Sequence, residues 1–344
     1  MHVSGNKGEV EMFNKIKEIF SADINNGSNL TLYKAKNKTI SVIIGILRYL
    51  TLVSIAYVVL YPMFYMVSSS FRSYTDFFDP GVLWIPKKFT MQWYEWAMDC
   101  LDFWVGLKNT VLFELVAAFL EVVSCSVIAY GLARFDFKGK KILMGFLILT
   151  ILVPDQMIII PKMMNFSHLD FFGILSLIEK ITGAAIRPNI LDTGFVFYLP
   201  SIFGIGLRSG IIMFIYMQFY KGLPKELEEA AWIDGAGLFQ TYTRIALPSS
   251  GVVITTVSIL SMIWHWNDFY LAYMLMNSHK AMPLAVKLSV IGEKLRATYS
   301  VYGGFQTIAT QGAACVLFVL PMLIMYIFLQ RKFVKSIDRV GITG

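Results

Sequence analysis

Six long apolar segments divide the chain, and they constrain its fold more than any other feature of the sequence. They cover residues 43–71, 110–132, 142–161, 196–220, 252–276 and 307–329. Each is close to or above the roughly 20 residues that an α-helix needs to cross the hydrocarbon core of a bilayer. The composition agrees, because 15% of the residues are charged, whereas soluble domains carry about 25%. We therefore predict an all-α membrane protein with six transmembrane helices.

The third segment contains Pro154 followed by Asp155, and we expect its helix to break there because proline removes a backbone hydrogen bond. The alternating ten-residue pattern of a membrane-spanning barrel is absent from the sequence. Helices are then the structure that satisfies the hydrogen-bonding groups of the backbone inside lipid.

Basic residues mark one side of this six-helix arrangement. They are Lys34, Lys36 and Lys38 before the first segment, then residues 134–141, 221–248 and 331–335. Cytoplasmic loops carry an excess of Lys and Arg. We therefore expect both termini of this multi-pass protein to be cytoplasmic.

The chain outside the apolar segments includes two longer polar stretches. Residues 1–40 are expected to form a cytoplasmic N-terminal tail before a transmembrane domain over residues 41–344. Residues 10–20 have helical spacing, which leaves open a helix on the membrane surface or a flexible tail. The tail does not resemble a cleavable signal peptide.

A charge-dense segment, residues 221–248, interrupts the apolar second half of the chain, and we name it the elbow. Pro224 suits a helix start, and the glutamates after it suit the positive end of a helix dipole. Gly235 suits the left-handed residue that ends a helix. A second short helix is expected from Leu238 to about Ala246. The pattern predicts a helix–glycine–helix turn between two membrane spans.

The elbow resembles the EAA loop of binding-protein-dependent ABC importer permeases. Glu229, Ala230 and Ala231 are followed at the family's spacing by glycine, and then by an isoleucine and a Leu-Pro pair. The resemblance implies a type I ABC importer permease fold in which the elbow is a cytoplasmic coupling helix. It implies contact with an ATPase subunit, where Glu229 would be a partly buried carboxylate facing a basic partner. The residues assigned to ATPase coupling in this way are Glu229, Ala230, Ala231, Asp234, Gly235, Ile245, Leu247 and Pro248.

Weaker matches extend the resemblance to the maltose-type group of carbohydrate importer permeases, from about residue 45 to the C-terminus. Residues 167–195 depart from the family pattern as an inserted extracytoplasmic loop, which is expected to cover the outer mouth or touch a binding protein. The tail before residue 40 is also longer than usual for the family. The matching motifs, in chain order, lie at residues 68–72, 109–110, 129–135 with 139–140, 153–154 with 160–161, and 266–269.

The resemblance also implies the partners and the setting of the protein. They are a second homologous permease subunit in a heterodimer, two ABC ATPase subunits, an extracytoplasmic solute-binding protein and membrane lipid, in a bacterial cell membrane. It implies transport of an oligosaccharide or related glycan. The chain itself lacks the phosphate-binding motif GxxxxGK[ST], so ATP hydrolysis is assigned to the separate subunits.

Polar residues within apolar segments are the candidates for a translocation path. They are Arg208, Trp264, Trp266, Asn267 and Asp268. Sugar sites combine aromatic faces with hydrogen-bonding groups, although Asn267 and Asp268 could instead only bridge helices. Glu114 and Glu121 lie seven residues apart on one helix face, and we expect them to pair structurally with a partner subunit rather than to relay protons.

Other functions remain open at this point. The cargo could be another small solute, such as glycerol phosphate or a polyamine. A channel or an ion-coupled secondary transporter would predict inverted repeats with matched broken helices, and none is visible. No metal-ligand spacing, nucleophile–base motif or basic patch for nucleic acid is present, so no catalytic residue, metal, cofactor or nucleic acid is assigned.

Overall fold

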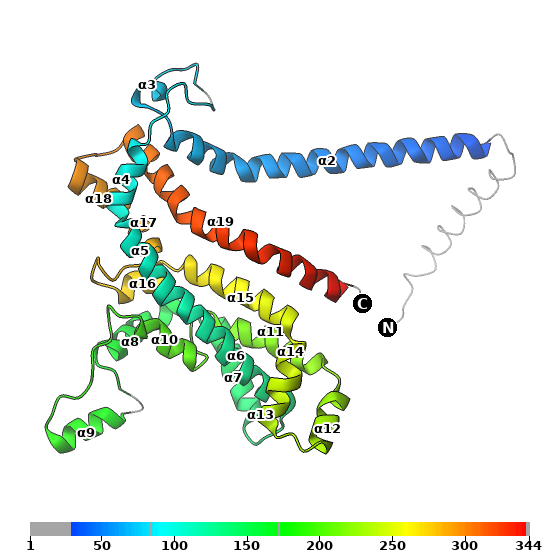
Figure 1. Cartoon of the computed structure of the whole chain (residues 1–344), viewed down its shortest axis with the longest axis vertical. Helices are drawn as coiled ribbons and strands as arrows, with labels where there is room; N and C mark the ends of the chain where they lie inside the picture. The colour runs from blue at the N-terminus through cyan, green and yellow to red at the C-terminus, as the bar shows by residue number, and fades with distance from the viewer. Residues whose placement is uncertain (1–28, 83, 171–172, 342–344) are drawn as a thin grey trace, which may run out of the picture. The chain divides into compact units, whose positions relative to one another are not determined.

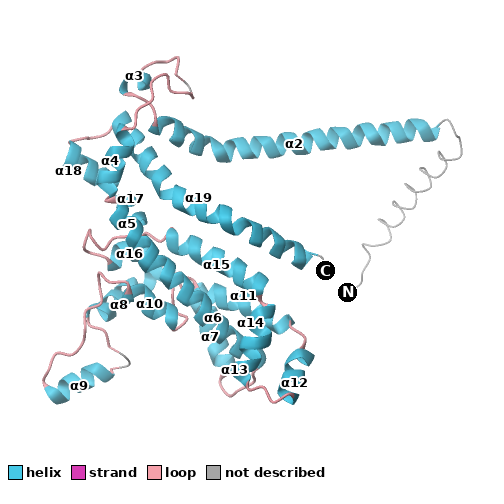
Figure 2. Cartoon of the chain, viewed as in Figure 1, coloured by secondary structure: helices cyan, strands magenta, loops and turns pink. Residues whose placement is uncertain are grey.

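The structure, a computed structural model, describes residues 29–82, 84–170 and 173–341, with side chains described between residues 40 and 328 of these ranges. The chain divides into two units, Met1–Tyr65 and Met66–Gly344. Helices dominate the described residues, which contain no strand and one isolated bridge between Arg72 and Phe89 (Figure 2). The prediction of an all-α protein is therefore confirmed for these residues.

The first unit contains most of helix α2, Asn29–Ser70, a single helix of 42 residues. Its part from Ile40 to Ser70 is long and apolar enough to cross a membrane, as predicted for residues 43–71. The helix begins at Asn29, so the predicted tail boundary at residue 40 falls inside a helix. Residues 10–20, with their expected helical spacing, lie outside the described residues.

The second unit begins with a run of helices that ends in the second predicted span (Figure 1). Phe103–Arg134 is helical throughout and passes the length and hydropathy test for a membrane span. A π-helical turn, Thr110–Leu115, lies inside it. The elements in order are α3 Tyr74–Phe77, α4 Gln92–Leu101, α5 Phe103–Asn109, the π-helical turn and α6 Val116–Arg134.

The third predicted span is two helices that meet at an angle of 104°. Helix α7, Lys140–Leu152, ends before Val153 and Pro154, both of which have extended backbone. Helix α8, Asp155–Ser167, follows. The predicted break at Pro154 and Asp155 is thus confirmed.

The fourth predicted span, residues 196–220, is not one continuous helix. Helix α10, Phe195–Ile202, and helix α11, Ser209–Gly222, are separated by a loop that begins near Gly204. Gly204 and Arg208 both have left-handed backbone, with φ of 68° and 59°. The sequence did not predict this break, because most residues of the loop are also apolar and hydropathy carries no information on backbone conformation.

The remaining elements lead from the elbow to the C-terminus. Three described helices qualify alone as membrane spans, or up to five if each of two sharply bent pairs counts as one. By length and composition alone, the described helices therefore give fewer than the six predicted membrane spans. The elements are α12 Lys225–Ile233, α13 Leu238–Thr241, a π-helical turn Tyr242–Ala246, α14 Leu247–Ser249, α15 Gly251–Trp266, α16 Tyr270–Leu275, α17 Leu284–Ser289, α18 Ile291–Tyr299 and α19 Phe305–Gly341.

Helix α6 organises the second unit, because α10, α11 and α15 all pack against it. One hydrophobic cluster joins α6 to α7, α11 and the elbow. A second joins α8, α10 and α16, and a third joins α4 and α5 to α17, α18 and α19. These clusters hold the elbow at one end of α6 and the α4–α5 region at the other (Figure 1).

Helix α5 packs so closely against α17 that residue 106 has to be a glycine. A Cβ atom on Gly106 would lie 2.8 Å from Leu284 Cδ2 and 3.2 Å from Lys287 Cδ. Hydrogen bonds also join these parts, since the Leu284 amide donates to Thr110 Oγ1 at 2.9 Å. The contact fixes the loop after the fifth predicted span against α5.

We expect Gly106→Val to destabilise the folded protein by about 1–3 kcal/mol, because the added methyl groups overpack this contact. Thermal unfolding of the purified protein in detergent measures the effect. Gly145→Val is the matched control, since a Cβ atom there meets nothing within 4 Å. Equal losses of stability in the two variants would contradict a steric origin at Gly106.

Candidate functional sites

The elbow folds as the sequence predicts, with one helix ending at a glycine and a second beginning shortly after it. Asp234 follows the last residue of α12, and Gly235 has φ of 82°, which is left-handed. The amide of Ala236 donates to the carbonyl of Ala231 at 2.9 Å and closes the helix end. Pro224 lies just before α12, and Pro248 lies inside α14, immediately ahead of the apolar helix α15.

The surface of the elbow is unusually apolar for an exposed polar segment. Glu229 and Ala230 are exposed there, together with Asp234 and Gly235, while Ala231 is half-buried. Ile245 and Leu247 are half-buried, and Pro248 is exposed. A group of exposed apolar side chains on one short segment is typical of a protein contact surface. Its members are Leu227, Trp232, Ile233, Leu238 and Phe239.

Glu228, rather than Glu229, is the buried carboxylate of the elbow. Arg134, the last residue of α6, donates from Nε to both carboxylate oxygens of Glu228 at 2.9 Å and 2.7 Å. Both side chains are 5% exposed. The Tyr130 hydroxyl donates to the same carboxylate at 3.1 Å. The first helix of the elbow is therefore fixed to the end of α6 by a buried ion pair.

Arg134 also fixes the entry to the elbow. Its Nη1 donates to the carbonyl of Tyr220 at 3.2 Å and to the carbonyl of Leu223 at 3.1 Å. One guanidinium thus holds the end of α11, the turn and α12 together. Sequence reasoning treated Glu228 only as a carboxylate favourable near a helix start, and its spacing from Arg134 gave no signal of pairing.

The second element of the site is a cavity of about 880 Å³ in the second unit. It lies among α7, α8, the loop between α10 and α11, and the junction of α15 and α16. Four of the five predicted path residues line it, namely Arg208, Trp264, Asn267 and Asp268. The Arg208 guanidinium lies over the Trp264 ring, 5.0 Å from its centroid.

The fifth predicted path residue, Trp266, lies elsewhere. It is 2% exposed and belongs to the hydrophobic cluster of α4 and α19. Its indole N–H donates to the carbonyl of Phe318 at 3.3 Å. Two positions along a helix differ by about 200°, so Trp264 and Trp266 cannot share a face.

The cavity also contains an ion pair that the sequence did not suggest. Lys162 Nζ donates to Asp155 Oδ1 at 2.8 Å across one face of α8. Both residues line the cavity. The part of the cavity wall formed by α8 therefore presents paired charges, and the α15–α16 junction contributes aromatic and amide groups to the same cavity.

Behind the cavity, a cluster of buried polar side chains joins four elements. His265 Nδ1 lies 3.0 Å from Glu114 Oε2, and His265 Nε2 lies 3.2 Å from Glu121 Oε2. The hydroxyls of Ser261 and Ser209 donate to Glu121 at 2.9 Å and 2.5 Å. The cluster ties α6 and the π-helical turn before it to α11 and α15.

The expected pairing of Glu114 and Glu121 with a partner subunit is corrected by these contacts. Both carboxylates reach His265 of the same chain, and all three side chains are at most 2% exposed. An imidazolium donates from both ring nitrogens, so it can serve both carboxylates at once. Unpaired carboxylates at this depth would be very unfavourable.

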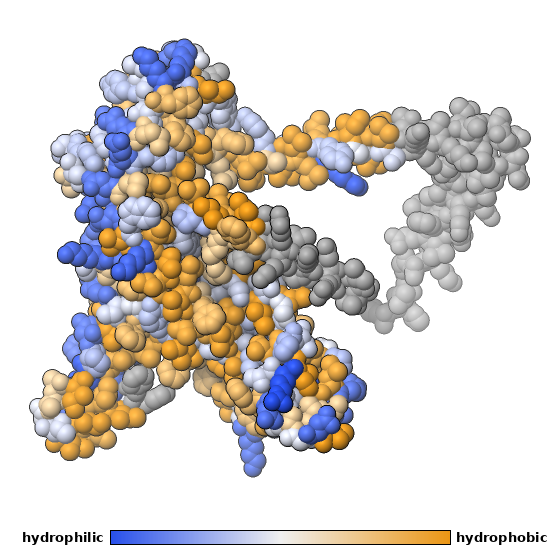
Figure 3. Space-filling view, in the orientation of Figure 1, coloured by the Kyte–Doolittle hydropathy of each residue, from blue (hydrophilic) through white to orange (hydrophobic). Residues whose placement is uncertain are grey.

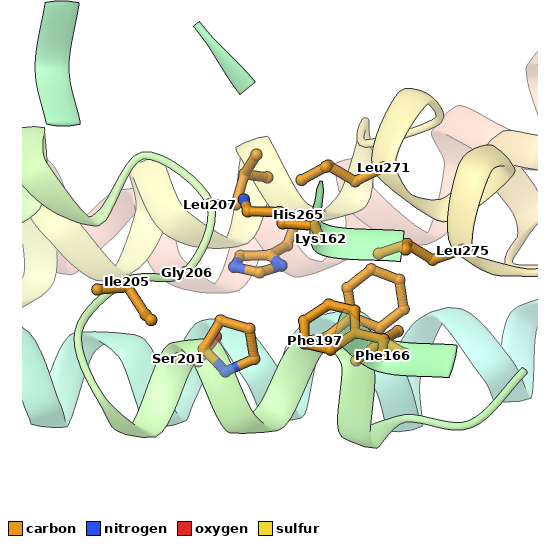
Figure 4. Close-up of a pocket in the computed structure, with 12 residues that line it drawn as sticks. Lys162, Phe166, Phe197, Ser201, Ile205, Gly206, Leu207, His265, Leu271 and Leu275 are labelled. Atoms are coloured by element: carbon orange, nitrogen blue, oxygen red, sulfur yellow. The ribbon is translucent and has the colours of Figure 1, made fainter. Parts of the chain in front are cut away.

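His265 also borders a small cavity of about 20 Å³, which has room for about one water molecule. Figure 4 shows His265 facing this space, with Gly206 and Leu207 on one side and Ser201 and Phe197 on the other. The loop between α10 and α11 therefore lies between the polar cluster and the larger cavity. In the part of the chain that the structure describes, no three His, Cys, Asp or Glu side chains are placed to hold a metal ion.

Long apolar helices, an exposed elbow and a cavity lined by polar and aromatic groups together describe a component of a membrane transport system. Residues 124–339 match the family described as "Binding-protein-dependent transport system inner membrane component". Since this match covers more than half of the sequence, the chain belongs to that family, and the resemblance noted from the elbow is confirmed.

Individual relatives are more distant but extend over most of the chain. The arabinooligosaccharides transport system permease protein AraQ of Halalkalibacterium halodurans is 25% identical, over 84% of this chain and 93% of the relative. The diacetylchitobiose uptake system permease protein DasC of Streptomyces coelicolor is 24% identical, over 83% of this chain and 92% of the relative.

The fold itself is that of a solved transporter. A bacterial ABC transporter involved in the import of the acidic polysaccharide alginate contains a chain that matches with a TM-score of 0.64. The two chains are 21% identical, over 85% of this chain and 96% of the other. The predicted ABC permease fold is therefore correct at the level of the chain's architecture.

We expect Glu228→Gln to reduce the free energy of unfolding by about 3–5 kcal/mol, because it leaves the Arg134 guanidinium buried without a counter-charge. Glu229→Gln changes the neighbouring, exposed glutamate and should shift stability by about 0.5 kcal/mol or less. Thermal unfolding of both variants in the same detergent checks the difference. Similar unfolding temperatures for the two would rule out the ion pair as the anchor of the elbow.

Proposed function

We propose that this chain is the membrane-spanning permease subunit of an ATP-driven importer that takes up an oligosaccharide or related glycan. The observation that carries the proposal is the elbow, which presents the motif residues Glu229, Ala230 and Gly235 on an exposed surface and is anchored behind by Glu228. The family membership agrees with this assignment. The names of its relatives favour a glycan cargo.

The elbow suits a contact that transmits force. Its outer face offers exposed aromatic and aliphatic groups, including Trp232 and Phe239, for a cleft in another protein. Its inner face is fixed to α6 through Glu228 and Arg134. Movement of a docked ATPase subunit would therefore rotate α6 with the elbow instead of bending the connection. Two such ATPase subunits are part of the proposed assembly.

The cavity is the proposed path of the cargo. A glycan offers hydroxyl groups and apolar ring faces, and the cavity supplies both kinds of partner. The Trp264 indole gives a flat surface, while Asn267, Asp268 and Arg208 supply donors and acceptors. The cavity in this chain would be completed by a second, homologous permease subunit.

The proposed topology has six crossings, with both termini and the elbow in the cytoplasm. The bent pair α7–α8 and the broken pair α10–α11 would each serve as one crossing. Irregular backbone at membrane depth is tolerated where it lines a cavity, which the loop between α10 and α11 does. An extracytoplasmic solute-binding protein would deliver the cargo to the opposite face.

The coupling role is tested by co-expressing the chain with the other genes of its operon and purifying the assembly. We expect the native chain to retain an ATPase subunit and Glu229→Lys to lose it, because the charge reversal lies on the exposed face of the elbow. Glu293→Lys is the matched control, since Glu293 is also exposed but lies in α18. Retention of the ATPase by folded Glu229→Lys would remove Glu229 from this contact.

The path is tested by substrate-stimulated ATPase activity and uptake in proteoliposomes. Trp264→Ala removes an aromatic contact of about 1 kcal/mol, so we expect roughly fivefold weaker uptake while the ATPase subunits still co-purify. Trp104→Ala removes an indole that is 70% exposed and outside the cavity. Unchanged uptake by Trp264→Ala, or an equal loss in both variants, would count against this path.

A further inference from the structure

Helix α9, Ile174–Thr182, buries none of its side chains. Among the helices of eight or more residues in the described part of the second unit, it alone has this property. It lies within the predicted insertion, residues 167–195. Four large aliphatic side chains recur at helical spacing along it and form a single face. They are Ile174, Leu177, Ile178 and Ile181, with exposed fractions of 55%, 59%, 37% and 76%.

The helix is held in place at both ends by polar contacts. At its start, Asp170 accepts hydrogen bonds from the amides of Leu175 at 2.9 Å and Ser176 at 3.3 Å. Near its end, Glu179 pairs with Arg187 at 2.6 Å and accepts from the backbone amides of Ile186 and Arg187, each at 2.9 Å. These contacts use the polar face, so the aliphatic face stays free.

The base of the insertion is also closed. The amide of Leu169 donates to the carbonyl of Pro188 at 3.0 Å, and the amide of Ile190 donates to the carbonyl of Phe166 at 2.9 Å. The insertion therefore leaves α8 and returns to α10 through a paired stem. Figure 1 shows α9 projecting from the second unit below α8, and Figure 3 shows the surface there as largely hydrophobic.

We propose that α9 is an interfacial anchor, lying in the plane of the membrane with its aliphatic face inserted among lipid chains. Nine residues make a helix of about 14 Å, far short of the roughly 30 Å needed to cross the hydrocarbon core. A short helix with one apolar face and one charged face is suited to the membrane surface.

Two observations favour lipid over a protein partner. The face consists of isoleucine and leucine, without the tryptophan, tyrosine or arginine that dominate protein contact surfaces. In the chain it also follows α8, whose Met157, Ile160 and Met164 are exposed in a helix that belongs to a membrane span if the bent pair α7–α8 counts as one span. The anchor would therefore continue an apolar surface that already faces the membrane.

The anchor is tested by spin-label accessibility in the assembled transporter, reconstituted in nanodiscs of phosphatidylethanolamine and phosphatidylglycerol. Labels are attached at Ile178→Cys and Ile181→Cys on the aliphatic face, and at Lys180→Cys on the polar face as the matched control. Cys315 is replaced by alanine, and the other two cysteines, Cys100 and Cys125, are buried. The parent protein without an introduced cysteine measures any signal from the native cysteines that remain.

We expect labels at residues 178 and 181 to be several-fold more accessible to oxygen, which concentrates in lipid, than to a water-soluble nickel complex. The label at residue 180 should show the reverse. High accessibility to nickel at all three sites would overturn the proposal in favour of a helix in water. A protein contact would instead give low accessibility to both reagents at residues 178 and 181. It would also be indicated if adding the binding protein lowered the accessibility of these labels, and either result would overturn the proposal. The accessibility readout requires no transport activity; the assembled sample and the addition of binding protein rest on the function proposed above.

Discussion

The buried ion pair between Arg134 and Glu228 determines how the rest of the second unit is arranged. A charge withdrawn from water at the end of a membrane helix needs a counter-charge nearby, and here the two groups come from segments 94 residues apart. Because Arg134 Nε donates to both oxygens of the carboxylate and the Tyr130 hydroxyl donates to one of them, α12 cannot turn independently of α6. The elbow is therefore a rigid lever at the end of the helix on which α10, α11 and α15 pack. A lever of this kind suits a protein whose transport depends on movement elsewhere in an assembly.

The same requirement for paired charges acts deeper in α6 and connects the lever to the cavity. Glu121 contacts His265 of α15 and receives a hydroxyl from Ser209 at the start of α11. These two helices carry the cavity residues Trp264 and, just before α11, Arg208. A rotation of α6 would be transmitted to both walls through these buried polar contacts. Separating these groups inside lipid would be unfavourable, so the bundle is expected to move as a body.

The sequence was most informative where a local rule decides the structure. Pro154 ended a helix, Gly235 adopted a left-handed backbone, and the elbow formed two helices around it. It was least informative where the structure depends on distant contacts. His265, the residue that Glu114 and Glu121 share, lies more than 140 residues away on α15, and no local pattern distinguishes Glu228 from Glu229. The break between α10 and α11 was missed for a different reason, since Ile202, Phe203 and Ile205 continue the apolar run while the backbone leaves the helix.

The exposed apolar surfaces of the elbow and of α9 differ in composition, and the difference bears on what each one is proposed to meet. The elbow combines aliphatic residues with Trp232 and Phe239 among charged groups, and it is anchored by a buried ion pair. Directional recognition by another protein benefits from such rigid aromatic groups. The face of α9 is purely aliphatic, and the helix is held by part-buried contacts at its start and exposed contacts near its end. Lipid chains offer no fixed shape, so a surface that meets them needs area and depth rather than complementarity. On the two proposals made above, the chain thus presents a shaped surface to a protein at the elbow and an unshaped one to lipid at α9.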